Sequence, residues 1–338
     1  MPDNDSSSAG LAGRSAAGVT PRLDYLPVGL FGGVMGLTGL SLGWRLATKV
    51  LAVPEEISVV IGFIAVAAFV VVSLAYLVKI VTAPQKVVAE FKNLIAGNLF
   101  GTFFISLLLL PLFLVHYSLP LARGLWVVGA IGMVVFAWVI VVRWISQPHE
   151  VVHVTPAWIV PAVGLLDVPL AVPVLQMPEY HEVMLFGLAI GLVFAVPVFT
   201  MSLGRLIVGT PMPDALQPTL LMLVAPFAVG FSTYIATTGK DDLFADALYM
   251  LTLFVLAVLV WRLARVLPGK AFKLTWWGTS FPLAAAAIAA LRYSTYHPSQ
   301  VSVGIAIALL ALASIAIAAL MLRTLLGLVR GELRTLAS

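Results

Sequence analysis

The stretch His149–His153 reads His-Glu-Val-Val-His, which matches the sequence pattern of zinc hydrolases letter for letter. On an α-helix this spacing places two imidazoles one turn apart, where they can bind zinc while the glutamate acts as a general base. Here Pro148 and Pro156 bracket the motif, and two β-branched residues lie inside it. The next candidate ligands, His181 and Glu182, lie beyond an apolar segment that we predict to cross a membrane. We therefore expect no metal site and no enzymatic activity, and keep an intramembrane metalloprotease as an alternative.

A second constellation is an aromatic ring beside a proline. Phe281 and Pro282 lie in the stretch Trp276–Ala285, which reads WWGTSFPLAA, inside an apolar segment that begins at Ala271. That segment has about 21 residues, the length that crosses a bilayer as a helix, and at about 1.5 Å per residue Phe281 lies about 15 Å deep. A phenyl ring at that depth can close a narrow apolar pore sterically and by excluding water, and the proline can set the bend that aims it. The ring can equally pack against a neighbouring helix.

The composition indicates a membrane protein. Hydrophobic residues make up 61% of the 338 and charged residues only 10%, against about 25% charged in ordinary soluble domains. The mean hydropathy is +1.08, which is more apolar than a soluble fold of this size can bury. There is no cysteine, which excludes disulfides and thiol chemistry. The net charge of +4 does not indicate nucleic-acid binding, because the basic residues fall between the apolar runs.

Ten apolar segments have the length and composition of membrane-spanning helices. We predict an all-α integral membrane protein with a disordered tail at 1–22 that lacks the apolar core of a signal peptide, a transmembrane domain at 23–328 and a short tail at 329–338. The predicted spans are Asp24–Leu42, Ile57–Lys79, Glu90–Leu114, Leu121–Trp144, Thr155–Leu175, Glu182–Ile207, Ala215–Thr237, Leu243–Arg265, Ala271–Leu291 and Ser299–Leu322.

The distribution of Lys and Arg predicts the orientation, because cytoplasmic loops carry an excess of both. If both termini and the links after the even-numbered spans face one side, that side holds fourteen of the 19 Lys and Arg residues. The other side holds Arg45, Lys49, Arg123, Lys240 and Arg292. This asymmetry predicts that both termini are cytoplasmic and that the number of spans is even.

Prolines and glycines recur inside the odd-numbered spans. The residues concerned are Pro27 and Gly32 in the first span, Gly97 in the third, Pro161 in the fifth, Pro226 in the seventh and Pro282 in the ninth. A proline kinks a helix, and in a membrane the freed carbonyl needs burial or nearby water. The alternation predicts five hairpins of one broken and one straighter helix, with the broken helices lining a central path. Pro197 in the sixth span departs from the pattern, and Pro and Gly are common in membrane helices generally.

Three stretches together resemble one family. They are Leu26–Gly32 (LPVGLFG), Thr155–Gly164 (TPAWIVPAVG) and Trp276–Ala284 (WWGTSFPLA). The sequence is similar to the tellurite-resistance/dicarboxylate transporter family, which includes the TehA-type bacterial channels and the plant slow anion channels. The resemblance extends from about Leu26 to Leu325, and Trp-Trp-x-x-Ser-Phe-Pro is its most specific part.

The resemblance implies a homotrimer in the bacterial inner membrane, with a separate pore in each protomer. It further implies that five hairpins surround the pore with pseudo-fivefold symmetry, that kinked odd-numbered helices line it, and that Phe281 gates it. The partners would be small anions and membrane lipid, with no cofactor and no nucleic acid. How the third span bends is left open, because it has no proline before Pro111.

The predicted pore helices carry few charges away from their ends, which argues against a proton-driven pump and favours passive anion passage between basic mouths. Asp167 is the exception, and we expect it near the outer interface, either solvated or paired. If it bound a proton or cation, the protein would be a coupled transporter of dicarboxylates or tellurite-like oxyanions. The prediction is thus an anion channel, with the coupled transporter and a membrane scaffold or sensor with an occluded pore as alternatives.

Overall fold

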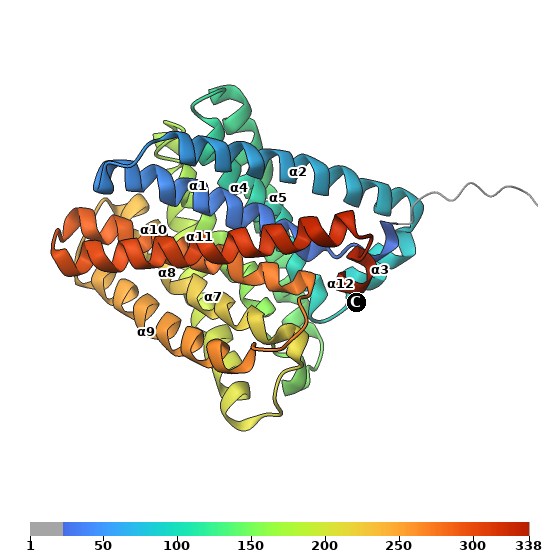
Figure 1. Cartoon of the computed structure of the whole chain (residues 1–338). Coiled ribbons are helices and arrows are strands. Elements are labelled where there is room, and N and C mark those ends of the chain that lie inside the picture. The colour runs from blue at the N-terminus through green and yellow to red at the C-terminus, as the bar shows by residue number, and fades with distance from the viewer. Residues whose placement is uncertain (1–22, 338) are drawn as a thin grey trace, which may run out of the picture.

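The computed structural model describes residues 23–337, which form helices and no β-strand over that range (Figure 1). The all-α prediction is confirmed for these residues, and the tail predicted at 1–22 lies outside them. Eight helical segments in this range are long and apolar enough to cross a membrane. They coincide with every predicted span except the first and the fifth. The chain is therefore a multi-pass membrane protein.

The even-numbered predicted spans are long α-helices without a break. They are α2 (Glu56–Thr82), α5 (Leu119–Ser146), α7 (His181–Val208), α9 (Leu243–Val266) and α11 (Gln300–Val329). In their most apolar windows only 17% to 39% of the residues are buried inside the protein. Most of their apolar side chains therefore face outward, as expected for helices whose solvent is lipid.

The odd-numbered predicted spans each combine a 3-10 helix with an α-helix. The pairs are η2 (Val28–Leu30) with α1 (Phe31–Leu51), η3 (Ala96–Phe100) with α4 (Gly101–Leu114), η5 (Pro156–Ile159) with α6 (Val160–Ala171), η7 (Asp214–Val224) with α8 (Ala225–Thr238), and η8 (Leu274–Thr279) with α10 (Ser280–Tyr296). In the third, seventh and ninth spans 72% to 83% of the apolar window is buried. These segments therefore form the inside of the protein.

The residues at the junctions explain why the helices change there. Pro161 and Pro226 occupy the first turn of α6 and α8, where the fixed φ of proline suits the helix and its missing N–H is not needed. In the third span Gly101 begins α4. A Cβ at this position would press against Phe136 and Val160, so the third span changes from 3-10 to α geometry at a glycine instead of a proline.

The buried helices contact one another in a closed order. α1 contacts α4, α4 contacts α6, α6 contacts α8, α8 contacts α10, and α10 returns to α1. Each of them also packs against the long helix that follows it in the chain, from α1 with α2 through α10 with α11. The architecture is thus an inner ring of helices covered by an outer layer.

The two described ends of the chain lie at the same end of the bundle (Figure 1). There Arg334 Nη2, in α12 (Leu333–Ala337), lies 3.1 Å from Asp24 Oδ1, in η1 (Leu23–Tyr25). This proximity requires an even number of crossings between them. We call this the terminal end and the opposite one the far end.

A buried ion pair holds the start of the first span at the terminal end. Lys79 Nζ lies 2.6 Å from Glu90 Oε2 and donates to the Leu26 carbonyl at 2.6 Å. Glu90, in α3 (Pro84–Lys92), also accepts from the Val28 N–H at 2.7 Å and from the Tyr76 hydroxyl at 3.0 Å. These contacts connect α2 and α3 to the turn that leads into α1.

Candidate functional site

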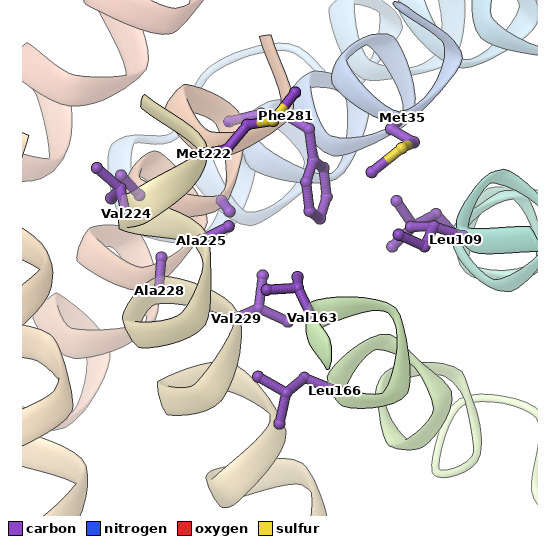
Figure 2. Close-up of a cluster of buried hydrophobic side chains, with 14 of the residues drawn as sticks. Met35, Leu109, Val163, Leu166, Met222, Val224, Ala225, Ala228, Val229 and Phe281 are labelled. Atoms are coloured by element: carbon purple, nitrogen blue, oxygen red, sulfur yellow. The ribbon is translucent and has the colours of Figure 1, made fainter. Parts of the chain in front are cut away.

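Phe281 is the second residue of α10, and its side chain points into the middle of the inner ring (Figure 2). The phenyl group is surrounded by Met35 from α1, Leu109 from α4, Val163 from α6 and Val229 from α8 (Figure 2). Phe281 is only 6% exposed. One aromatic side chain therefore lies where the inner helices converge, surrounded by apolar side chains.

Three cavities lie inside the ring and follow one another from end to end. The far cavity, of about 380 Å³, extends from Phe281 to Arg292 at the far end. The middle cavity, of about 30 Å³, lies on the other side of Phe281. The terminal cavity, of about 60 Å³, continues from the middle one to Pro27. All the inner helices contribute residues to the far cavity, so it lies inside the ring and not between two neighbouring helices.

Phe281 lines both the far cavity and the middle cavity. Its phenyl ring therefore separates a wide space from a narrow one. The middle and terminal cavities share Gly32, Thr102, Met222 and Gly278, so these two cavities adjoin each other. An apolar ring at such a constriction can exclude water and ions.

The far cavity carries a basic lining. Arg45, Lys49, His116 and Arg292 line it, together with the single acidic residue Glu55. Arg45 Nη2 lies 3.5 Å from Glu55 Oε1. Arg45 Nε and Nη1 and Arg292 Nε are shielded from solvent and have no hydrogen-bond partner in the part of the chain that the structure describes. Guanidinium groups have only donors, so these N–H groups are free to bind an acceptor with negative charge.

His116 follows α4 in the chain and faces the same cavity. Burial, and after it the nearby Arg45 charge, lowers the pKa of His116, while Glu55 acts in the opposite direction. The imidazole is therefore neutral at pH 7 and becomes an additional positive charge only in acid.

The residues predicted to form the pore take different positions. Pro27 lines the terminal cavity, Gly32 the terminal and middle cavities, and Pro282 the middle cavity. Pro161 lines a separate groove between α5, α6 and α7 on the outside of the ring. Gly97 packs against the Phe91 backbone and Arg143.

Pro226 is buried in the first turn of α8 and is not among the residues that line the three cavities. Pro226 therefore lies where the chain changes from the 3-10 helix η7 to the α-helix α8. The cavity surface is instead formed by its neighbours Ala225, Ala228 and Val229.

Sequence reasoning missed Arg45 and Arg292 as residues that line the cavity. It ended the first and ninth spans at Leu42 and Leu291, whereas α1 continues to Leu51 and α10 to Tyr296. A signal was present, because Phe281, Ala285, Ile288 and Arg292 follow the i, i+4, i+7, i+11 spacing of one helix face, and all four line the far cavity.

Asp167 lies in α6 and is fully buried. Neither of its carboxylate oxygens has a hydrogen-bond partner among residues 23–337. The expectation that it would be solvated or paired is therefore wrong. Ionising such a carboxyl inside a membrane is costly.

The zinc-hydrolase motif does not adopt the geometry that the chemistry needs. Val151–His153 forms a single 3-10 turn, so His149 and His153 are not one α-helical turn apart. The imidazole of His149 packs edge-on against Trp158, with ring centroids 5.1 Å apart. Within the described part of the chain, neither histidine belongs to a group of three converging His or carboxylate side chains.

The chain is similar in sequence to known proteins that include an anion channel. The S-type anion channel SLAH3 of Arabidopsis thaliana is 27% identical over 314 residues, which cover 90% of this chain and 49% of the plant protein. The chain thus spans about half the length of that relative. The tellurite resistance protein TehA homolog of Haemophilus influenzae is 26% identical over 312 residues, which cover 91% of this chain and 92% of the homolog.

A family model described as a voltage-dependent anion channel, SLAC1, matches residues 25–325. The match covers nearly all of the described helices and includes Phe281 and the residues that line the cavities. The resemblance inferred from three short stretches is confirmed, and the chain belongs to the SLAC1 family of voltage-dependent anion channels.

Proposed function

We propose that this protein is a passive channel for small anions and that Phe281 is its gate. The observation that carries the proposal is the position of one phenyl ring between the far and middle cavities. The cavities on both sides of Phe281 lie along the inside of the helix ring. Rotation or removal of the phenyl group would therefore join them. Conduction then requires no cofactor and no chemical step.

The preference for anions rests on the far cavity. Its lining has two guanidinium groups with unpaired, shielded N–H donors and an excess of positive over negative side chains. A cavity with walls of low dielectric constant concentrates ions of the opposite sign. The middle and terminal cavities are lined by apolar residues and threonines, which fits weak binding and rapid release of small anions.

The proposed channel has ten membrane crossings, arranged as five hairpins with pseudo-fivefold symmetry. The cyclic contacts of the inner helices and the packing of each on its successor support this arrangement. Two observations support cytoplasmic termini. The first and last described residues lie at the same end of the bundle, and Lys and Arg are distributed unevenly between the two predicted sides of the membrane. Family membership supports a homotrimer in the bacterial inner membrane, with one pore in each protomer.

Anion currents from the wild type and from Phe281→Ala test the proposal. We expect small wild-type currents and much larger currents from the variant, because alanine removes the ring that separates the cavities. Phe231→Ala is the matched control: Phe231 is fully buried on α8, packs against Tyr249, and does not line the three cavities. Equal currents from the two variants, at equal surface expression, would refute the gate.

A second candidate function is proton-coupled transport of dicarboxylates or tellurite-like oxyanions. The observation that favours it is Asp167, a fully buried carboxyl with no hydrogen-bond partner among the described residues. Under this alternative Asp167→Asn abolishes uptake driven by a pH gradient. Under the channel proposal the same variant conducts anions as the wild type does.

A further inference from the structure

Three side chains that can bind metal converge at the far end, away from the axial cavities. Asp241 precedes α9, Asp246 lies in its first turn, and His297 follows α10. One ligand atom from each lies within 4.8 Å of the other two. His297 Nε2 is 3.0 Å from Asp241 Oδ2 and 3.3 Å from Asp246 Oδ1.

A simple ion pair leaves this group incompletely satisfied. Asp241 Oδ1 is shielded from solvent and accepts no hydrogen bond from the described residues, and Asp246 Oδ1 is approached by His297 Nε2 at 3.3 Å without a hydrogen bond of good geometry. One imidazolium can neutralise only one of two carboxylates, and buried acceptors without partners are costly. A divalent cation would neutralise both carboxylates.

The histidine is held by a stack of aromatic rings. The imidazole of His297 lies 4.5 Å from the ring of Tyr293, and Tyr293 lies 4.0 Å from Tyr249, with interplanar angles of 26° and 18°. The His297 carbonyl accepts a hydrogen bond of 2.7 Å from the Ser302 hydroxyl. The ring is thus fixed by α9, α10 and α11 together, as a preorganised ligand requires.

A third aspartate in the same segment, Asp242, is already occupied by other contacts. It lies between Asp241 and Asp246 in the chain and caps α9 by accepting from the Phe244 and Ala245 N–H groups at 3.0 and 3.3 Å. It accepts a further hydrogen bond of 2.7 Å from the Tyr234 hydroxyl. Asp242 is therefore fully engaged, which leaves Asp241 and Asp246 as the available carboxylates.

We propose that Asp241, Asp246 and His297 form a binding site for a divalent transition-metal ion, with Zn²⁺ as the representative. One imidazole nitrogen and two carboxylate oxygens are ligands that such ions accept, and water can fill the remaining position. The bound ion would tie the loop between α8 and α9 to the end of α10. Because α10 carries Phe281 near its other end, the site offers metal ions a contact with the helix of the proposed gate.

Metal binding to the purified full chain tests this proposal, independently of any conduction. The protein should carry a tag without histidine and be stripped with a chelator before titration. Co²⁺ is followed by its visible absorption, and Zn²⁺ by competition with a coloured chelator. We expect one equivalent to bind, and Asp246→Asn and His297→Gln each to weaken affinity by at least about tenfold, since even the outer partners of metal ligands contribute this much.

His153→Gln is the matched control, because it removes a histidine from the hydrolase-like motif instead. We expect it to bind metal as the wild type does. Thermal unfolding without metal establishes that each variant is folded. The proposal is overturned if the wild type binds no stoichiometric metal, if His297→Gln binds normally, or if His153→Gln removes the binding.

Discussion

The buried ion pair at the terminal end allows a quantitative test of the fold. We consider the substitution Glu90→Gln, which keeps the shape of the side chain and removes its charge. The side chains of Lys79 and Glu90 are only 4% and 12% exposed. In the variant the Lys79 ammonium stays buried with neutral acceptors alone, the Leu26 carbonyl and the introduced amide oxygen.

The expected loss follows from this burial. Removing one partner of a buried pair costs about 3–5 kcal/mol, because the other charge is left uncompensated. The chain also contains a matched control at the same end. Lys270 and Asp214 approach to 2.5 Å, but their side chains are 40% and 60% exposed. An exposed pair contributes about 0–1 kcal/mol, so Asp214→Asn should have little effect.

The assay is the midpoint of thermal unfolding in detergent at one fixed heating rate, under conditions in which cooling restores the folded signal, so that the midpoint reports an equilibrium. At about 2–4 °C per kcal/mol, Glu90→Gln should lower the midpoint by roughly 6 °C or more. The double variant Glu90→Gln with Lys79→Met should recover part of this loss, because no charge remains buried. Equal shifts for Glu90→Gln and Asp214→Asn, or no recovery in the double variant, would refute the reasoning.

Three further predictions concern the inner ring and its cavities. Arg292→Gln in a conducting Phe281→Ala background should lower anion current about two- to tenfold at low salt and much less at high salt, measured by voltage clamp, since the charge acts through the solvent of the far cavity. Gly36→Ala should destabilise the protein by about 1–3 kcal/mol in thermal unfolding, because a Cβ there would collide with the first residue of α10; Gly304→Ala, with open space around it, should not. The pKa of His116 lies below its ordinary value of 6.5, so acidification from pH 7 to 5 should raise the Phe281→Ala current as the imidazole gains charge. The additional substitution His116→Gln should remove this increase. A rise that persists in His116→Gln would show that another group is responsible.

Hydropathy predicted most of the helices, and Pro and Gly marked where the inner ones break. Segments such as α2 and α11 are uniformly apolar and end in polar loops, so length alone locates them. The first span was harder, because Arg45 lies in the last third of α1 and a charge ordinarily marks the end of a span. Its side chain instead faces a cavity that is formed only when the inner helices assemble.

The remaining features depend on contacts between distant parts of the chain. No local pattern indicates that Asp241 and His297 meet, because they lie in separate loops at the far end. The burial of Asp167 was missed for a related reason. Its position late in a span favours contact with water or a partner, whereas α6 is enclosed by α4, α5, α7 and α8, and the carboxyl is buried.

The reversal potential of the Phe281→Ala current tests the central claim most directly. It should be measured with a tenfold chloride gradient at equal pH, and again with a pH gradient superimposed. For a passive anion pore we expect a reversal near the chloride equilibrium potential that the pH gradient leaves unchanged. A reversal that moves with the pH gradient, or the absence of current from a variant present at the surface, would contradict a passive anion pore gated by Phe281.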